Sequence, residues 1–149
     1  MAIKPIPTGY HTVTPLLLVK DAAKLIDFIV TAFNGVEKGR HEMDGKVTHA
    51  EVTIGDSVLM IGEASDRWPE VNAALYLYVK DTDSVYKQAV KAGGKSIREP
   101  KTEFYGDRSA GVEDNFGNQW WIATHVEDVS PEELEKRMKK AYQGSNSNS

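Results

Sequence analysis

The chain has 149 residues, a net charge of −4 and no cysteine. This length suits one domain, the acidic charge disfavours nucleic acid as a partner because phosphates need a basic face, and the missing cysteine excludes disulfides and thiolate zinc ligands. The first ten residues show no signal-peptide pattern and no apolar run reaches membrane-spanning length, so we expect a cytoplasmic protein without a membrane partner.

The first half of the chain predicts a strand, a helix and three further strands. The helical spacing of apolar residues begins after Val19-Lys20-Asp21 and ends at Asn34-Gly35, a C-cap signal. Gly55-Asp56 predicts a hairpin turn. The strands are expected, in order, over residues 12–19, near 39–42, over 49–54 and over 57–61.

The second half repeats this order. Val79-Lys80-Asp81 recurs 60 positions after the first such triplet, and the helix that follows ends at Gly93-Gly94. The hairpin glycines, Gly55 and Gly117, lie 62 positions apart. The strands are expected over residues 74–79, near 96–98, over 112–116 and over 119–126. This periodicity predicts two copies of a βαβββ unit, over about 8–63 and 72–126, in a single domain spanning 1–130.

A last helix is predicted over residues 130–143. Ser130-Pro131-Glu132-Glu133 forms a capping box with proline at the first helical position. Leu134, Met138 and Ala141 give the helix a narrow apolar stripe. Residues 144–149 are polar and of low complexity, so we expect a disordered tail.

The order of short motifs along the chain resembles that of the vicinal oxygen chelate superfamily, which includes glyoxalase I, bleomycin-resistance proteins and extradiol dioxygenases. The resemblance covers about residues 8–130. Within the superfamily, the chain is most similar to the PhnB-like branch. The motifs are Gly9-Tyr-His-Thr-Val-Thr-Pro15, His49-Ala-Glu51, Gly55-Asp-Ser-Val-Leu-Met60, Phe104-Tyr-Gly-Asp-Arg-Ser109, Asp114-Asn-Phe-Gly117 and Ile122-Ala-Thr-His125.

The resemblance implies an α+β fold in which two βαβββ modules form curved mixed sheets around a cavity. In metalloenzymes of the superfamily, four His or Glu ligands line that cavity. By the family spacing, the corresponding positions here are Thr14, Leu59, Ala74 and Trp121. None of these residue types binds a divalent ion, and a shift of one residue offers no ligand either. We therefore expect no metal and no cofactor at the family site.

Alternation along the strands predicts which side chains face the cavity. On the strand over 49–54, the apolar set is Ala50, Val52 and Ile54, which leaves His49 and Glu51 toward the cavity. The same reasoning, together with the loop before residue 109, gives the full candidate site. It comprises Thr14, His49, Glu51, Tyr76, Tyr105, Arg108, Trp121 and His125.

The roles of three groups among these residues remain open. His49, Glu51 and His125 are either a hydrogen-bonded polar cluster, a direct ligand contact, or a relocated metal or acid–base site. Trp121 and Tyr76 either stack on a planar ligand or fill a collapsed cavity. Arg108 either grips a carboxylate or phosphate, or serves as a loop clasp or dimer contact.

We expect a metal-free protein that binds and sequesters a small aromatic or cationic molecule. Because bleomycin-resistance proteins have their sites at a subunit interface, the resemblance also implies a homodimer. The alternative is a metal-dependent lyase, isomerase or dioxygenase with a non-standard site at His49, Glu51 and His125. A third hypothesis is an interaction protein whose cavity is filled. The ligand, and whether modules pair within or between chains, are left open by the sequence.

Overall fold

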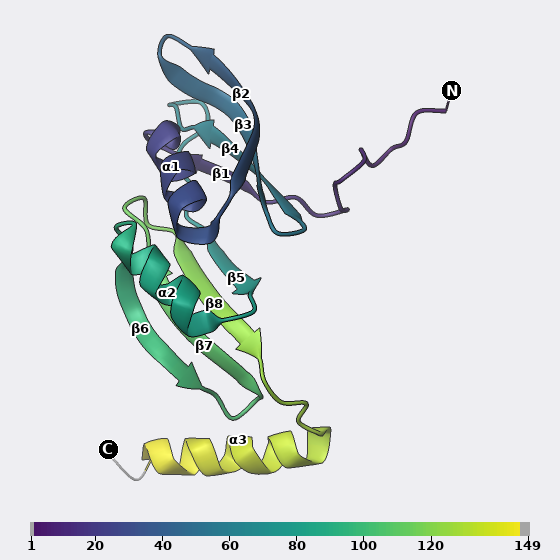
Figure 1. Cartoon of the computed structure of the whole chain (residues 1–149), viewed down its shortest axis with the longest axis vertical. Helices are drawn as coiled ribbons and strands as arrows, with labels where there is room; N and C mark the ends of the chain where they lie inside the picture. The colour runs from purple at the N-terminus through teal and green to yellow at the C-terminus, as the bar shows by residue number, and fades with distance from the viewer. Residues whose placement is uncertain (1, 147–149) are drawn as a thin grey trace.

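The computed structural model describes residues 2–146, which form two modules with the same order of elements (Figure 1). The first module contains β1 (Leu16–Val19), α1 (Ala22–Phe33), β2 (Val36–Met43), β3 (Lys46–Ile54) and β4 (Ser57–Glu63). The second contains β5 (Ala74–Tyr78), α2 (Thr82–Lys91), β6 (Lys95–Thr102), β7 (Asp107–Glu113) and β8 (Gln119–His125). A third helix, α3 (Pro131–Asn146), follows. The predicted α+β fold, two βαβββ units and a C-terminal helix, is confirmed.

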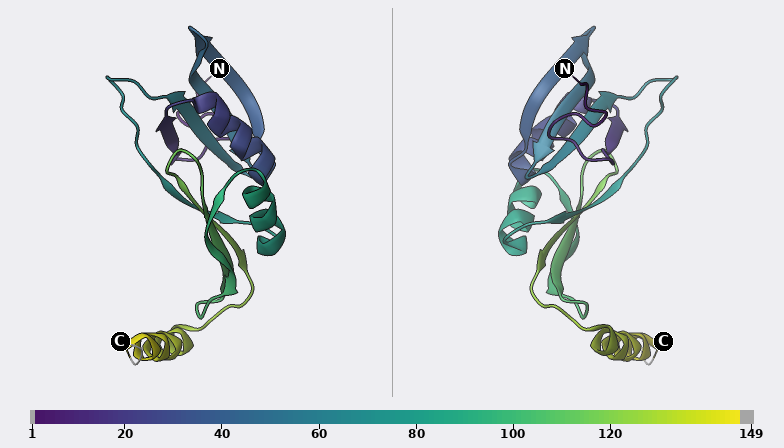
Figure 2. Two further views of the ribbon diagram at one scale, coloured as in Figure 1. Left: turned by 90° about the vertical axis from the view of Figure 1, so that its left-hand side faces the viewer. Right: turned by 90° about the vertical axis from the view of Figure 1, so that its right-hand side faces the viewer.

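Each module forms one mixed four-stranded sheet, in the orders β1-β4-β3-β2 and β5-β8-β7-β6. β1 and β5 run parallel to their neighbours β4 and β8, and the other pairs are antiparallel. Helices α1 and α2 cover the same side of the two sheets and contact each other (Figure 2). The opposite side of each sheet is called the open face below. Over residues 2–146 the sheets do not close into a barrel.

Several boundaries differ from those predicted. β1 begins at Leu16 rather than at residue 12, because Pro15 has no N–H to donate. β7 begins at Asp107, five residues before the predicted start, and pairs with β8 along its whole length. α3 continues to Asn146, past the predicted end at 143, so part of the predicted tail is helical. Residues 147–149 of that tail lie outside the described residues.

The hydrophobic core lies between the helices and the covered faces of the sheets. Val52 and its cross-strand partner Leu59 are both buried in it. Leu59 therefore lies on the covered face, although the family spacing predicted it on the open face. Met60 takes the open-face position opposite Leu16. The cause is the turn length: Ile54 pairs directly with Ser57 in the first hairpin, whereas residues 114–118 separate the paired strands in the second.

Aromatic rings join the two modules. Phe33 of α1 lies with its ring centroid 4.9 Å from that of Trp120 on β8, and the Phe28 centroid lies 6.4 Å from the same indole. All three side chains are buried in one continuous core. Gln88 of α2 adds a hydrogen bond to the carbonyl oxygen of Thr31 at the end of α1 (2.8 Å). The modules therefore share a core rather than being linked only by a loop.

The two helices begin differently although both follow Val-Lys-Asp. Asp81 caps α2 by accepting a hydrogen bond from the Ser84 N–H (3.2 Å). Asp21 has a left-handed backbone (φ 68°) and makes no side-chain cap. Instead, the carboxylate of Glu63, at the end of β4, accepts from the N–H groups of Asp21 (2.8 Å) and Ala22 (3.1 Å). A negative charge at a helix N-terminus also interacts favourably with the helix dipole and so stabilises the helix.

Asp114 organises the turn between β7 and β8. Its buried carboxylate accepts hydrogen bonds from the Phe116 and Asn118 N–H groups, the Asn118 side chain and the Trp120 indole, at 2.8–3.0 Å. Removing one acceptor leaves several buried donors without a partner, and each such donor costs about 1–3 kcal/mol. The turn thus fixes the position of the indole that joins the modules.

We predict that Asp114→Ala lowers the free energy of unfolding by about 3 kcal/mol or more, because several buried donors lose their acceptor together. Urea denaturation followed by tryptophan fluorescence measures this change. The control is Asn115→Ala in the same turn, where the side chain is exposed. It should change stability by about 0.5 kcal/mol at most. Equal effects of the two substitutions would contradict the role given to Asp114.

Candidate functional site

A buried carboxylate lies at one end of the open face of the second sheet. Asp107, 5% exposed, begins β7 directly opposite His125 of β8. Its Oδ1 lies 2.9 Å from His125 Nδ1. Its Oδ2 accepts hydrogen bonds from the Tyr76 and Tyr78 hydroxyls, each at 2.9 Å. We call Asp107, Tyr76, Tyr78 and His125 the Asp107 cluster.

Strand register explains why these four side chains meet. Asp107 and His125 form a cross-strand pair, so their side chains leave the same face of the sheet. Tyr76 and Tyr78 are two residues apart on β5 and share that face. Tyr78 is in register with Ala123 of β8. Because alanine is small, the tyrosine side chains can reach across β8 to β7.

Hydrogen bonding shifts the pKa values in the Asp107 cluster. Burial raises the pKa of Asp107, but the bonds from His125, Tyr76 and Tyr78 lower it by more, so it lies below its usual range. Burial and the bond to Asp107 raise the pKa of Tyr76, and the same bond is the main reason that the pKa of Tyr78 is raised. At neutral pH the carboxyl is therefore ionised and the phenols are protonated.

His125 is held between two carboxylates. Besides its contact with Asp107, its Nε2 lies 2.6 Å from Oδ1 of Asp128, which is fully exposed. Both contacts raise the pKa of His125, the one with Asp107 more strongly. An imidazolium ion can donate from both ring nitrogens, so this arrangement favours the charged form.

The Asp107 cluster borders a groove of about 1110 Å³ between the two modules. Tyr76, Tyr78 and His125 are among the residues that line it. The rest comes from the hairpin between β3 and β4, the start of α2, the end of α1 and the covered side of β5 and β8. These residues include Ile54, Gly55, Ser57, Leu59, Lys80, Val85, Phe33, Leu75, Leu77 and Trp120. Small-molecule sites have this character, mostly apolar walls with a few polar groups.

His49 and Glu51 lie on the open face of the other sheet, as alternation predicted. His49 Nε2 lies 3.6 Å from Glu51 Oε1. The Tyr10 hydroxyl also donates to Glu51, and this bond is the main reason that the pKa of Glu51 is lowered. His125 does not join them. The three residues of the proposed alternative site are therefore divided between the two sheets of one chain.

Of three further candidate residues, Trp121 and Tyr105 belong to the second module and Thr14 precedes the first strand. The indole of Trp121 packs against Gly111, and the guanidinium of Arg98 lies 5.7 Å from its ring centroid. Tyr105 interacts with Tyr76 through its hydroxyl and is 39% exposed. Thr14 is half-buried and precedes β1. Trp121 is thus already covered by protein groups, which favours a packing role over ligand stacking.

Arg108 points to the covered side of the second sheet, away from the open face. Its Nε and Nη2 donate to both carboxylate oxygens of Asp83 in the first turn of α2 (2.7 and 2.9 Å). It points away from Asp107, because neighbouring residues of β7 leave opposite faces of the sheet. This placement favours the clasp interpretation and does not support Arg108 as a cavity residue.

The ligand positions of the family's metalloenzymes do not fit a metal here. On the open face they hold Thr14, Met60, Ala74 and Trp121, none of which supplies an imidazole or a carboxylate. Among residues 2–146, no three His, Asp or Glu side chains are close enough to share an ion. The side chains that one chain places at the family's ligand positions therefore do not form a metal site.

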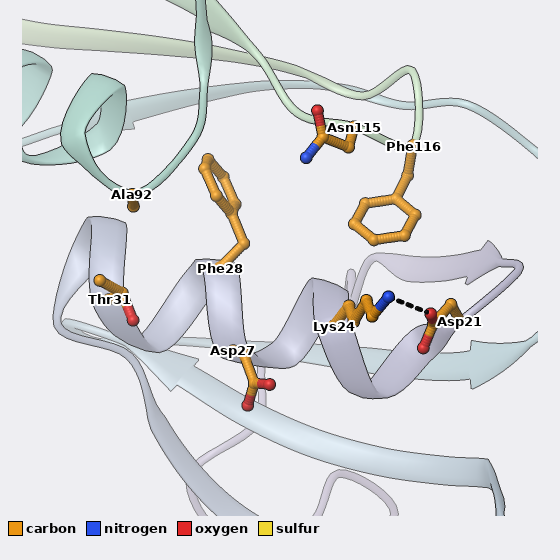
Figure 3. A pocket seen from close by; sticks show the side chains of 8 residues that line it. All are labelled: Asp21, Lys24, Asp27, Phe28, Thr31, Ala92, Asn115 and Phe116. Carbon is orange, nitrogen blue, oxygen red and sulfur yellow. Dashed lines mark ion pairs between the residues drawn. The ribbon is translucent and has the colours of Figure 1, made fainter.

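A second, smaller pocket lies on the helical side, away from the Asp107 cluster (Figure 3). It measures about 420 Å³ and lies between α1, the end of α2 and the turn after β7. The rings of Phe28 and Phe116 face its interior, and an ion pair between Lys24 and Asp21 (3.3 Å) forms one end.

Sequence reasoning missed Asp107 and Tyr78. Asp107 lay in a segment expected to be a loop, so its pairing with His125 was not visible. Alternation along the strand puts Tyr78 on the same face as Tyr76, but the sequence shows no partner for it. A usable signal was present: two tyrosines at i and i+2 beside a strand that ends in histidine indicate a shared acceptor on the next strand.

With the fold and site described, comparison with known proteins places the chain in a family. Residues 10–122 match the model of the Glyoxalase/Bleomycin resistance protein/Dioxygenase superfamily. The chain belongs to this superfamily. An uncharacterised protein of Mycobacterium bovis is 31% identical over 146 residues, covering 88% of this chain and 94% of the relative. A protein of Mycobacterium tuberculosis is equally similar, with 84% of the relative covered.

Solved structures share the fold of this superfamily member. TioX from Micromonospora sp. ML1 has a TM-score of 0.66 and 20% identity, covering 76% of this chain and 99% of TioX. A glyoxalase/bleomycin resistance protein/dioxygenase family enzyme from Burkholderia phytofirmans has a TM-score of 0.63 and 15% identity, with 76% and 97% covered. None of the helices within residues 2–146 has the length and apolar character needed to cross a membrane.

We predict that His125 titrates above its usual value of 6.5, because Asp107 and Asp128 stabilise its charged form. NMR titration of the ring protons measures this pKa, and the missing signal in His125→Gln identifies the residue. Asp107→Asn should lower the pKa of His125 more than Asp128→Asn does.

The same interaction makes stability depend on pH. Since the folded pKa is raised, the contribution of His125 is fully present below the unfolded pKa of 6.5 and is lost as pH rises through the folded value. The stability advantage of the wild type over His125→Gln should therefore shrink with rising pH. A pKa of 6.5 or lower in the folded protein would contradict this account.

Proposed function

We propose that this protein binds a small aromatic cation in the groove beside the Asp107 cluster, without a metal ion, and acts by holding that molecule rather than transforming it. One observation carries the proposal. The Tyr76 and Tyr78 rings, 45% and 65% exposed and 5.3 Å apart, line a groove of ligand size with the ionised Asp107 beneath their hydroxyls. Tyrosine faces attract cations, and more strongly when a site excludes water.

The charge of the groove supports a cationic rather than an anionic ligand. Asp107 and Asp128, which both contact His125 at the edge of the groove, together carry more negative charge than His125 compensates. Among the lining residues themselves, Asp56 offsets Lys80. The guanidinium of Arg108, which an anionic ligand would need, is bound to Asp83 on the other side of the sheet. The superfamily includes enzymes as well, but the uncharged residues at the metal positions favour binding alone. We retain the PhnB-like branch as part of this proposal, on the motif Phe104-Tyr-Gly-Asp-Arg-Ser109.

We further propose that the protein works as a homodimer. Leu16 is 52% exposed on the open face of the first sheet, and the rings of Tyr76 and Tyr78 are exposed on that of the second. A second copy that covers these faces would bury apolar surface and narrow the groove. Light scattering across a dilution series measures the mass, and a monomer at all concentrations would overturn this part of the proposal.

The binding proposal predicts selective recognition of N-methylquinolinium over 4-methylquinoline, a neutral compound of similar shape at pH 7.5. Isothermal titration should detect the cation, and Tyr78→Ala should weaken its affinity by about 2- to 30-fold, corresponding to about 0.5–2 kcal/mol for a cation–π contact. Arg108→Ala is the matched control, since its side chain lies on the covered side, and should bind like the wild type. Equal binding of both compounds would contradict a cation site.

Metal analysis separates binding from metal-dependent catalysis. Protein purified without chelator should contain no stoichiometric Zn, Ni, Mn or Fe, and His49→Ala should change nothing in this respect. A stoichiometric metal that disappears in His49→Ala would support the enzyme alternative. Absence of thermal stabilisation by any compound in a broad screen would instead favour a filled cavity, since a ligand at 100 times its dissociation constant adds about 2.7 kcal/mol.

A further inference from the structure

Strand β5 has one free edge. It is the outermost strand of the second sheet and is in register with β8 alone (Figure 1). The Val79 N–H donates to the Ala123 carbonyl oxygen (2.7 Å), and the Gln119 N–H donates to the Ala73 carbonyl oxygen (2.9 Å). Along a strand, the backbone groups of successive residues point to opposite edges. The odd-numbered residues from 73 to 79 therefore face β8, and the even-numbered residues between them face away from it.

The free edge presents the backbone of Tyr76 and Tyr78. Within residues 2–146, neither residue uses its N–H or its carbonyl oxygen in a hydrogen bond to another element. The Tyr76 carbonyl oxygen and the Tyr78 N–H are consecutive groups on this edge, so an acceptor and a donor lie side by side. Unpaired groups of this kind form a template for a partner with the complementary pattern.

The groove runs along this free edge. Residues 75–80 all line it. Among them, Leu77 and Val79 belong to the covered side of the sheet, whereas Tyr76 and Tyr78 belong to the open face. A groove that is lined by both faces of an outermost strand passes along the edge of that strand. A ligand in the groove can therefore reach the tyrosine rings and the free backbone groups together.

We propose that the ligand of this groove is an aromatic cation that carries a primary carboxamide, and that the carboxamide pairs with the free edge of β5. Its N–H donates to the Tyr76 carbonyl oxygen, and its carbonyl oxygen accepts from the Tyr78 N–H. The inference rests on the proposed function, because the aromatic cation occupies the same groove, and it adds the group by which that cation is recognised.

The pattern of the edge selects a carboxamide over other polar groups. A carboxamide holds a donor and an acceptor on one side of its plane, as the backbone of a paired strand does. A carboxylate offers only acceptors and an ammonium group only donors, so neither pairs with both backbone groups. A carboxamide is also uncharged, so the ligand keeps the positive charge that the Asp107 cluster favours.

A pair of ligands that differ in one donor tests this inference. The cation 3-carbamoyl-1-methylquinolinium has the ring and charge of N-methylquinolinium, and 3-acetyl-1-methylquinolinium keeps the carbonyl acceptor but lacks the N–H. Isothermal titration should show about 2- to 12-fold tighter binding of the carboxamide, the effect of one hydrogen bond of ordinary strength. Equal affinities would overturn the carboxamide assignment and leave the proposed function standing. If none of the three cations binds, both fail.

Hydrogen exchange on the wild type reports the backbone contact itself. With the carboxamide at about 10 times its dissociation constant, the Tyr78 amide proton should exchange about 10 times more slowly, because only the unliganded protein exchanges. N-methylquinolinium at the same saturation is the control for simple covering of the edge and should protect this proton less. The Leu77 N–H faces β8 and is protected in either case. Equal protection of Tyr78 by the two cations would contradict the proposed pairing.

Two substitutions at one position separate the backbone group from the ring. Tyr78→Ala and Tyr78→Pro both lack the phenol, but only the proline variant also lacks the N–H. Proline is tolerated in an outermost strand where its N–H would point away from the sheet. The two variants should bind N-methylquinolinium alike, and Tyr78→Pro should bind the carboxamide about 2- to 12-fold more weakly than Tyr78→Ala. Equal binding of the carboxamide would overturn the inference. If Tyr78→Pro does not fold, the exchange measurement on the wild type decides.

Discussion

The burial of Trp120 is the interaction on which the arrangement of the two modules depends. Its ring contacts Phe28 and Phe33 of the first module, and its indole N–H donates to Asp114 of the second. The contact is apolar on one side and hydrogen-bonded on the other, so both the distance and the orientation of the indole are fixed. Since the groove lies between the modules, this contact contributes to its width, together with the contact between α1 and α2.

The two faces of each sheet make different contacts, and consecutive residues along a strand lie on opposite faces. Trp120 joins the modules while Trp121 packs on Gly111 on the open face. Arg108 binds the start of α2 while Asp107 collects the Tyr76, Tyr78 and His125 side chains. A substitution in β7 or β8 therefore changes contacts on only one face of the sheet, according to its position along the strand.

Periodicity was sufficient to predict the duplicated unit because each module repeats the start of the helix, the glycine that follows it and the hairpin glycine at nearly one offset. The offset failed for Leu59, since the two hairpin turns differ in length and reverse the face of the strand. It also failed for Asp107, whose role depends on register between distant strands. Tyr76 and His125 were found because alternation alone places them, whereas their shared acceptor required three-dimensional pairing.

Glu63 links the last strand of the first module to its first helix. Because its carboxylate replaces the missing cap at Asp21, the end of β4 cannot fray without releasing two N–H groups of α1. Local opening at either place therefore exposes the other. Amide protons in the first turn of α1 and at the end of β4 are therefore expected to exchange as one cooperative unit, although more than 40 residues separate them in the chain.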